Sequence, residues 1–548
     1  MKAKKLMALW LTGAMCFSML TGCGNSTADM QATEKEETAG GEEAVQEENV
    51  ATAVPEGMVP AEGISDETLK VACDGEPTSI FPNYVTNKTS NRVDSCLFDT
   101  LVRWNDEEKK AYPSLATKWE FIDDTHVEFT LRDDVYFSNG ELMTANDVKA
   151  SLQASFDYTL NHYSLMFDME HTEVVDDTHI IVALSRPYGN LPEILGCTYY
   201  AIFSEKAFEE AGKDETVFAM NPVGSGPYVL DSWQTGEKMT LVRNENYWDR
   251  ENLPYYKYIE FSFIQDPVAR ATALQSGDVQ IAFNLSTNQV EELREKDNIT
   301  VNVYEQNVTL PIWFTPKAYP VLEDENVRKA ILLSLDKELL AQAAYAGFAE
   351  PSYSSVTGPA SPYYYECEDY EQNVEEAKQL IADSGYGAEE LTFTTYAVNG
   401  ASSAHYEVMK AQLAAIGVTL NIETVDLVVM LQHSWNGEIA IGFGENDTWD
   451  VGRMLEFADS RIETSWNAYV GEGEEELHDL IDAAWAASDE ERYDAYAKVQ
   501  DFLADHYACS TVCDVVIPDA WASNLTGVVY DAHCWPNIYN VRPLVEKE

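Results

Sequence analysis

The spacing of apolar residues has a period of two in several short segments. Residues 125–137 (THVEFTLRDDVYF) and 179–185 (HIIVALS) alternate between apolar and polar side chains, and residues 69–74 (LKVACD) begin in a similar way. Such alternation places successive side chains on opposite faces of a strand. The pattern therefore predicts strands in these three segments.

Other segments repeat their apolar residues every three or four positions, as an amphipathic helix does. In 144–160, Thr144 is a candidate N-cap, and Asp147 follows three residues later. Further helices are predicted at 324–348 (one long helix ending at Gly347), 373–387 (ending at Gly385), 489–506, and 403–426, where a glycine separates the helix from a strand. Helices that alternate with short strands predict a layered α/β fold.

The N-terminus has a different polarity pattern. Lys2, Lys4 and Lys5 precede an apolar run from Leu6 to Leu20, which is the order typical of a secretory signal. A run of about fifteen residues is shorter than the roughly twenty that a membrane helix needs. We therefore expect this segment to be cleaved.

The apolar run ends in Leu20-Thr21-Gly22-Cys23, which resembles the bacterial lipobox. In that motif a diacylglycerol is attached to the cysteine, which becomes the new N-terminus after cleavage. We expect residues 1–22 to be a lipoprotein signal peptide and Cys23 to carry acyl chains, palmitate among them, that hold the protein at the outer face of the cell membrane. The alternative is an ordinary signal followed by a chance cysteine.

Residues 23–67 have the composition of a tether. Between Gly24 and Glu67 there are twelve acidic residues, one basic residue (Lys35) and no aromatic residue. Such a segment buries too little apolar surface to offset its ordering entropy. We expect an acidic, disordered spacer.

The overall charge excludes one class of partner. Loss of the signal leaves 32 basic and 94 acidic residues, a net charge of −62. Nucleic acid is excluded as a partner because phosphate binding depends on basic patches. The acidity is typical of a soluble, mutually repelling surface, and attraction of cationic ligands is the functional alternative. The length of the chain after the tether predicts two or three domains.

The cysteines do not form an obvious disulfide framework. Nine are present, and seven remain once Cys16 is cleaved off and Cys23 is acylated, so at least one is unpaired. Cys509 and Cys513 follow His506 at a spacing that metal ligands can have, but their surroundings are apolar and no fourth ligand is obvious. Buried thiols or one disulfide are favoured over zinc, and we expect no metal site and no cofactor.

Catalytic signatures are also missing. The chain has no H-E-x-x-H, no G-x-x-x-x-G-K-[ST] and no G-x-S-x-G motif, and its histidines are scattered. Ser225 lies between glycines in VGSGP, but the spacing of a nucleophile elbow is lacking. The sequence therefore predicts a protein that is not an enzyme.

Three blocks in order resemble the family 5 extracellular solute-binding proteins, the peptide- and nickel-binding components of ABC importers. The first is 97–153 (LFDTLVRW…NDVKASLQ), and the second is 221–249 (NPVGSGPY…RNENYWD), continued by 266–282 (DPVARATALQSGDVQIA). The third comprises ENVRKAILLSLDKELL, QNVEEAKQLIADSGY and AQLAAIGVTLNIE. Within the second block, Gly224, Gly226 and the flanking prolines are expected to be structural, as are Tyr247 and Trp248.

The resemblance implies a two-lobed, periplasmic-binding-protein-like fold of type II, with an additional inserted domain and a hinge between the lobes. By analogy, lobe I comprises residues 68–88, 200–312 and 508–548. The inserted domain comprises residues 89–199, and lobe II residues 313–507. Ligand is expected to be enclosed between the lobes.

The resemblance also implies where ligand binds. Peptide-binding members have an aspartate after a Gly-Trp step that pairs with the peptide α-amine. Here Gly442-Phe443 matches that step, and Asn446 falls at the aspartate position. Either Asp447 or Asp450 supplies the charge, or the ligand has no free amine; an enclosed carboxylate favours a cationic partner.

The other half of the expected site is Thr86-Asn87-Lys88, which aligns with residues that pair with peptide backbone in relatives; an ordinary surface loop is the alternative. Aromatic residues near both halves suit peptide side chains or sugar rings. The expected contacts of this kind are Trp435, Phe443 and Trp449, and Tyr84, Trp313 and Phe314 are further candidates.

The resemblance thus implies a monomeric, lipid-anchored receptor that captures oligopeptides and delivers them to ABC permease and ATPase subunits. The alternatives are capture of an oligosaccharide or another small solute and, from a different class, a surface hydrolase or a sensor accessory.

Overall fold

A computed structural model divides the chain into two units, residues 1–48 and 49–548. The described residues all belong to the second unit. They are Val54 and residues 57–547 except 83–87, 106–109, 159–165, 346–348, 350, 353, 355, 359–360, 362, 368–370, 399–403, 444–445, 448–450, 463–464, 466 and 531–535. The predicted signal peptide, Cys23 and most of the expected tether lie outside this set. No helix within it is long and apolar enough to cross a bilayer.

The largest sheet is mixed and has nine strands in the order β16-β13-β18-β12-β2-β11-β10-β9, with β17 also on β13. β2 is parallel to its neighbours β11 and β12, and the other pairs are antiparallel. The strands are β2 (Thr68–Cys73), β9 (Tyr228–Gln234), β10 (Lys238–Arg243), β11 (Tyr258–Phe263), β12 (Ile281–Ala282), β13 (Ile299–Phe314), β16 (Ile441–Phe443), β17 (Asn446–Asp447) and β18 (Cys509–Ala522).

Smaller sheets surround the large one. A four-stranded antiparallel sheet has the order β5-β6-β8-β7 and a three-stranded sheet the order β1-β22-β19, while β14-β15, β3-β4 and β20-β21 are pairs. Their strands are β1 (Met58–Pro60), β3 (Val102–Asn105), β4 (Lys110–Pro113), β5 (Ala116–Asp123), β6 (His126–Leu131), β7 (Glu173–Asp176), β8 (His179–Ala183), β14 (Thr392–Val398), β15 (Thr419–Val425), β19 (Leu525–Thr526), β20 (Val529–Tyr530), β21 (Pro536–Asn537) and β22 (Arg542–Glu546).

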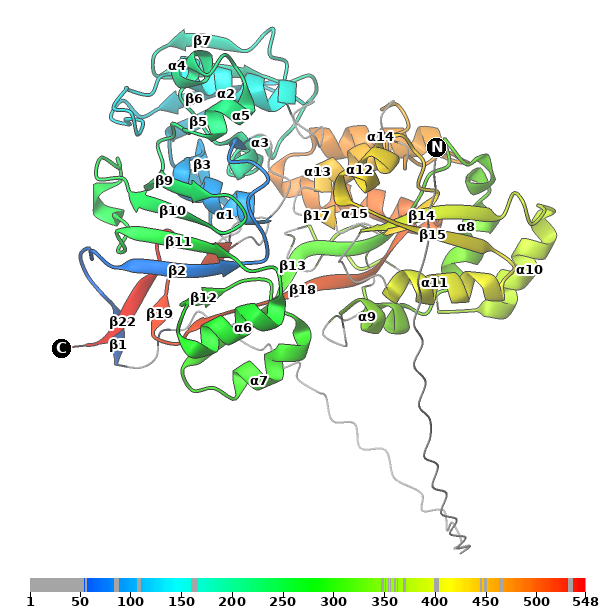
Figure 1. The fold of residues 1–548 in the computed structure, drawn as a ribbon. Coiled ribbons are helices and arrows are strands. Elements are labelled where there is room, and N and C mark those ends of the chain that lie inside the picture. Colours follow the sequence, from blue (N-terminus) through cyan, green and yellow to red (C-terminus); the bar gives the residue numbers. More distant parts are fainter. Residues whose placement is uncertain are drawn as a thin grey trace, which may run out of the picture. The chain divides into compact units, whose positions relative to one another are not determined.

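The α-helices lie mainly between the strands along the chain (Figure 1). They are α1 (Lys88–Leu97), α2 (Ala145–Tyr158), α3 (Leu191–Ile194), α4 (Glu205–Glu210), α5 (Glu215–Ala219), α6 (Pro267–Ser276), α7 (Val290–Arg294), α8 (Glu325–Leu333), α9 (Lys337–Tyr345), α10 (Val374–Ser384), α11 (Ala404–Ala415), α12 (Leu427–Trp435), α13 (Val451–Ala458), α14 (Glu474–Ala486) and α15 (Asp489–Asp505).

Two large hydrophobic cores are joined by the strand pair β13–β18. The first core contains β2, β10, β11, the four-stranded sheet and α13–α15, and the second contains α8–α11, β14 and β15. At one end of the pair, Ile299 and Ala520 belong to a small cluster beside β2, whereas Leu310 and Val512 belong to the second core. Figure 1 shows the two long strands running side by side between these parts. The strand pair is therefore a covalent crossover between them.

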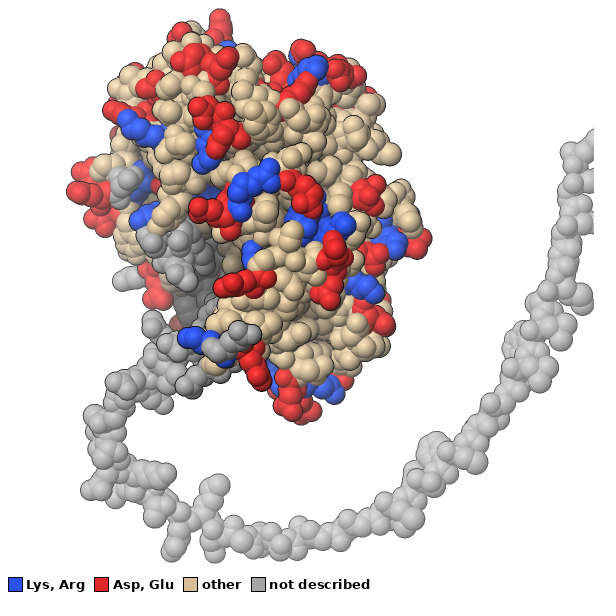
Figure 2. Space-filling model, turned by 90° about the vertical axis from the view of Figure 1, so that its left-hand side faces the viewer, with Lys and Arg blue, Asp and Glu red and all other residues tan. Residues whose placement is uncertain are grey.

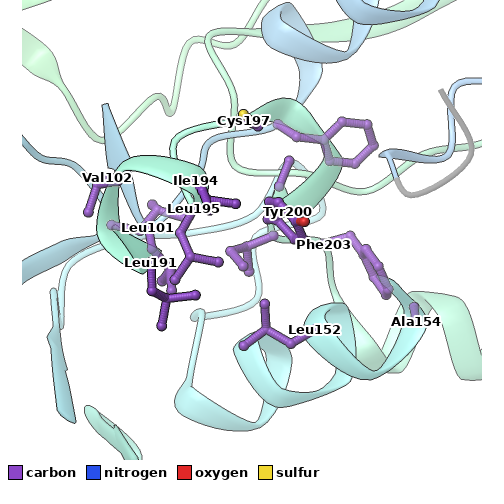
Figure 3. Packing of buried hydrophobic residues seen from close by; sticks show 14 of the residues in the cluster. Leu101, Val102, Leu152, Ala154, Leu191, Ile194, Leu195, Cys197, Tyr200 and Phe203 are labelled. Carbon is purple, nitrogen blue, oxygen red and sulfur yellow. The ribbon is translucent and has the colours of Figure 1, made fainter. Parts of the chain in front are cut away.

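The first core is densely packed around the segment that precedes α4. Figure 3 shows Leu152 of α2 together with Tyr200 and Phe203 of the segment that precedes α4. Phe203 contacts Phe208 and Phe218 with ring centroids 5.3 Å and 5.4 Å away. Aromatic clusters of this kind bury a large apolar area. This cluster packs α4 and α5 against the segment that precedes them.

The glycines of VGSGP are structural, as the sequence predicts. A Cβ atom on Gly224 would collide with the carbonyl oxygen of Leu97, and a Cβ on Gly226 would lie 2.6 Å from the amide nitrogen of Phe98. Ser225 between them donates a hydrogen bond to Asp99 (3.1 Å). The loop therefore packs directly on the backbone at the end of α1, where only glycine fits.

The aromatic residues of the RNENYWD motif are hydrogen-bonded to Asp99 as well. Its carboxylate accepts hydrogen bonds from the Tyr247 hydroxyl (3.2 Å) and the Trp248 indole nitrogen (2.8 Å). Arg103 donates to the same group (3.1 Å). Both aromatic residues are thus held through their polar atoms, which agrees with a structural role for the motif.

Most of the predicted elements are confirmed. The strands expected at 69–74 and 179–185 correspond to β2 and β8. The strand expected at 125–137 is confirmed only as far as Leu131, where β6 ends. α2 begins after Thr144, whose amide and hydroxyl both donate to the Asp147 carboxylate (2.8 and 3.0 Å). α10 ends at Gly385, which has a φ of 77°. Local capping chemistry was sufficient to place these ends.

The prediction of one long helix over 324–348 is wrong. The segment forms two helices, α8 and α9, which are separated at Ser334–Asp336. Ser334 donates to the carbonyl of Ile331 (2.7 Å), and Asp336 accepts from the amide of Leu339 (2.9 Å) as the cap of α9. These side chains compete with the helix for backbone groups. The helix is therefore interrupted here, although the helical spacing of apolar residues continues across the break. The predicted end at Gly347 lies outside the described residues.

Ordered structure begins before the expected end of the tether at residue 67. β1 pairs with β22 near the C-terminus, with Met58 opposite Glu546 and Pro60 opposite Leu544. The amide of Ala61 then donates to the carbonyl of Pro543 (2.8 Å). The local composition did not predict this strand, because its backbone hydrogen bonds are made with β22, which is distant in the sequence.

Asp94 of α1 is fully buried, and neither of its carboxylate oxygens has a hydrogen-bond partner among the described residues. Burial alone raises the pKa of this carboxyl well above its ordinary value. The folded protein therefore retains a proton that the unfolded chain releases above about pH 4. This group's contribution to stability is complete below that pH and is lost as the pH rises toward its folded pKa.

We predict that Asp94→Asn stabilises the protein at pH 8 by about 1 kcal/mol or more relative to its effect at pH 5, because the amide has no proton to lose. Urea unfolding at the two pH values measures the difference. Asp157→Asn on the exposed surface of α2 is the control and should show no such difference. Equal effects of Asp94→Asn at both pH values would contradict the prediction.

Candidate functional site

The crossover pair is irregular near its middle. Glu305 lies opposite Val516 and Thr309 lies opposite Asp514, so that β13 advances four residues while β18 advances two. The extra residues form a bulge, a feature that often lies beside binding sites. The bulge separates the part of the pair beside the first core from the part in the second core.

The second-lobe residues expected to bind ligand come to the β13 edge at this bulge. β17 places Asn446 opposite Thr309 and Asp447 opposite Val308. Phe443 ends the neighbouring strand β16. The chain thus brings the predicted anchor segment to the crossover strand through backbone pairing.

The structure describes the backbone, but not the side chains, of Trp435, Phe443, Asn446 and Asp447. Trp435 is the last residue of α12. The expected contacts that lie outside the described residues are Thr86, Asn87, Trp449 and Asp450, together with Tyr84. Their roles remain predictions.

Lys88 is the described member of the first-lobe half. It is the first residue of α1 and is half-buried. Burial raises the pKa of Asp519 on β18, and the positive charges of Arg92 and Lys88 oppose that rise. Lys88 lies one helical turn before Arg92 on α1, and Arg92 donates to Asn284, whose amide donates to Asp519.

Asp519 is the centre of a buried polar cluster. It is completely buried and accepts a hydrogen bond from the backbone amide of Asn284 (2.8 Å) and another from the Tyr530 hydroxyl (3.3 Å). Asn302 of β13 donates to the same hydroxyl (3.1 Å). The carboxylate thereby ties both crossover strands to the segment that follows β12.

An ion pair between the buried Arg92 and the half-buried Asp74 extends this cluster. Arg92 of α1 lies 3.7 Å from Asp74, its guanidinium lies 4.2 Å from the centre of the Phe283 ring, and it donates to the side chain of Asn284 (3.2 Å). Asn284 in turn donates to Asp74 (2.7 Å). Burial raises the pKa of Asp74, but Arg92 and Asn284 outweigh it, and the pKa is below its ordinary value. The site beside Lys88 therefore holds fixed charges.

The two halves lie along one strand. Asp514 marks the end beside β17, and Asp519 marks the end beside Lys88. The five residue-to-residue steps from Asp514 to Asp519 in β18 span about 17 Å. That length fits an elongated solute of a few residues better than a single ion.

Two of the aromatic candidates belong to the cores. Trp313 is 6% exposed and packs against Phe457 with ring centroids 6.3 Å apart, and Phe314 is 1% exposed in the second core. Both lie on β13, which is covered on both sides. Burial of this kind favours packing over stacking on a solute.

The candidate zinc ligands near 509 do not converge. His506 pairs through Nδ1 with Glu325 (3.0 Å). Cys509 and Cys513 are both buried, and burial raises the pKa of the Cys509 thiol far above its ordinary value, which disfavours the thiolate that zinc requires. Within the described ranges, no group of three or more His, Cys, Asp or Glu side chains is placed to hold a metal.

Sequence reasoning missed the buried cluster. Asp74 directly follows a buried strand, and Asp519 interrupts the apolar run VVIPDAWA. A charged residue in such a place is a signal because it needs a partner. Its partners, Arg92 and Asn284, are far away in the sequence, and their positions could not be inferred from spacing.

Two cores joined by paired crossover strands, with helices against a mixed sheet, define the class of type II periplasmic binding proteins. Residues 110–460 match the family model described as bacterial extracellular solute-binding proteins, family 5 Middle. The chain belongs to this family of ABC-transporter solute-binding proteins. At the level of the family these are extracellular binding proteins and not enzymes.

The individual relatives have low sequence identity to this chain. The chain is 26% identical over 372 residues to the glutathione-binding protein GsiB of Salmonella typhimurium, across 66% of this chain and 70% of that protein. The structure of AppA from Bacillus subtilis in complex with a nonapeptide has a TM-score of 0.73 at 21% identity and covers 88% of this chain and 100% of that one. DppA from Helicobacter pylori in complex with the peptide STSA gives 0.74 at 23% identity, with coverages of 88% and 98%. These structural similarities show the shared fold.

Proposed function

We propose that the protein is the substrate-binding lipoprotein of an ABC importer and that it captures oligopeptides between two lobes. The observation that carries this proposal is that the 446–447 segment pairs with β13, while α1, which begins at Lys88, is connected through Arg92 and Asn284 to Asp519 of β18. A solute held at both points would bridge the two cores. Its release to the permease would then need only a hinge motion at β13 and β18.

The proposed lobes follow the expected boundaries. Lobe I comprises residues 68–88, 200–312 and 508–548, residues 89–199 form the inserted domain, and lobe II comprises residues 313–507. β13 crosses the boundary between residues 312 and 313, and β18 begins at Cys509, directly after the boundary between residues 507 and 508. Two strands in one hydrogen-bonded pair can bend together, as a hinge requires.

A peptide is favoured over a neutral solute by the charges of the two halves. Asp447 is in the strand that lies on the bulge of β13, where an enclosed carboxylate would need a cation such as an α-amine. Lys88 at the other half can attract the opposite, anionic end. The relatives, a glutathione-binding protein and two proteins whose structures contain peptides, support the same class.

Capture of peptides can be tested with the full mature chain. Calorimetry with a random tripeptide-to-hexapeptide pool, followed by mass spectrometry of the retained fraction, should give saturable binding and recover intact peptides. Sugars retained in place of peptides would move the ligand to the oligosaccharide class. Release of cleaved products would refute a pure binding function.

We predict that Asp447→Asn raises the dissociation constant of the retained peptides about thirtyfold or more, because the α-amine loses its charged partner. Asp383→Asn on the exposed surface of α10 is the control and should leave affinity unchanged. N-acetylated peptides should lose the same factor with the wild-type protein. Unchanged affinity in Asp447→Asn would remove this residue from the anchor role.

A further inference from the structure

Arg186 makes a contact that no binding motif accounts for. It lies in the loop after β8, and its guanidinium donates a hydrogen bond to Glu456 of α13. The same guanidinium lies 4.3 Å from the ring centre of Trp485 on α14. Arginine can pair with a carboxylate and stack on an indole at the same time because its guanidinium is planar.

The loop around Arg186 fits closely on these helices. Tyr188 packs on Trp485 with ring centroids 4.7 Å apart, and the two rings are only 2% and 5% exposed. A Cβ atom on Gly189 would collide with the guanidinium of Arg492 on α15. The four-stranded sheet region thus has a complementary surface against α13–α15.

Helix α13 connects this surface with the candidate site. It begins at Val451, directly after the segment that carries the predicted anchor residues. Phe457, next to Glu456, packs on Trp313 of the crossover strand β13. A shift of α13 would therefore change its contacts with Arg186 and with the crossover strand, and would displace the predicted anchor segment.

The exposure of the ion pair is suited to reversible formation. The side chain of Arg186 is 27% exposed and that of Glu456 is 16% exposed. Water reaches both groups, so separating them costs less than breaking a fully desolvated pair. The more deeply buried Tyr188 and Trp485 add apolar area that is covered only when the surfaces meet.

We propose that Arg186 is a positioning residue for ligand retention: its contact with Glu456 and Trp485 forms when the inserted domain and the second lobe close on a solute, and breaks when they open. This inference rests on the proposed solute-binding function. Arg186 itself acts through α13 and does not touch the solute.

The variants that test this are Arg186→Gln, Glu456→Gln and the charge swap Arg186→Glu with Glu456→Arg. Arg132→Gln is a matched control, because Arg132 also pairs with a carboxylate (Asp134, 2.7 Å) and lies 4.6 Å from a tryptophan ring centre (Trp248), but neither partner belongs to the proposed second lobe, residues 313–507. Spin labels at Lys118→Cys and Lys378→Cys, both exposed, report the distance between the two parts in the full chain.

We expect Arg186→Gln to shift the spin-label distances to longer values and to speed dissociation of a fluorescent random hexapeptide pool about tenfold with little change in the association rate. The charge swap should restore both readouts in part, and Arg132→Gln should change neither. Superimposable distance distributions for Arg186→Gln and wild type, with and without the pool, would overturn the proposal and show a permanent structural interface. If the pool does not bind to wild type, the proposed function fails, and the distances still decide whether the contact opens.

Discussion

Gly226→Ala is expected to lower the free energy of unfolding by at least about 3 kcal/mol, or to prevent folding, because the new methyl group would meet backbone atoms. Its Cβ would lie 2.6 Å from the amide nitrogen of Phe98 and 2.7 Å from the carbonyl oxygen of Cys96. Backbone at the end of α1 cannot rotate away as a side chain could. Urea unfolding followed by tryptophan fluorescence measures the loss.

Gly75→Ala is the matched control for this change. A Cβ at Gly75 would have no neighbour within 4 Å, and its φ lies outside the left-handed region. We expect its stability to stay within about 0.5 kcal/mol of wild type. Equal stabilities of the two variants would show that the VGSGP loop can move away from α1.

Arg92→Met should destabilise the fold by about 1–3 kcal/mol, because it removes a buried guanidinium that donates to Asn284 and pairs with Asp74, whose side chain is 39% exposed. Asp74 would lose the charge that lowers its pKa, and Asn284 would lose a hydrogen bond. The methionine keeps most of the side-chain volume over Phe283. Unfolding in urea at pH 7 gives the size of the loss.

Arg294→Met provides the comparison for Arg92. Arg294 lies the same 3.7 Å from its partner, Glu291, but is 51% exposed, whereas Arg92 is 1% exposed. A solvent-exposed pair contributes about 0–1 kcal/mol. If both variants lost the same small amount, Arg92 would contribute no more than a surface residue.

The sequence specified local structure better than it specified breaks and long-range contacts. Thr144 and Asp147 placed the start of α2 because both capping groups lie within one turn. The break between α8 and α9 was missed because Ser334 and Asp336 interrupt the backbone bonding without interrupting the apolar spacing.

The same limit applies to the candidate site. The segment 446–447 was found through a resemblance, and its pairing with β13 became visible only in the fold. The Asp74–Arg92–Asn284–Asp519 cluster joins residues up to 445 positions apart. No periodicity or spacing rule connects such residues, because their proximity results from packing of the whole sheet.

The pairing of β1 with β22 has a mechanical consequence for an anchored receptor. Arg542 of β22 donates to the carbonyl of Leu253 (2.8 Å), and the amide of Ser65 donates to the carbonyl of Tyr255 (2.7 Å), so the segment that contains β1 and Ser65 is held against the part that contains β10 and β11. In the proposed lipoprotein, tension from a lipid at Cys23 would act on this part and not on the helices around β14 and β15. In that arrangement the proposed second lobe could move about the hinge while the proposed first lobe stays held at the membrane, beside the proposed permease.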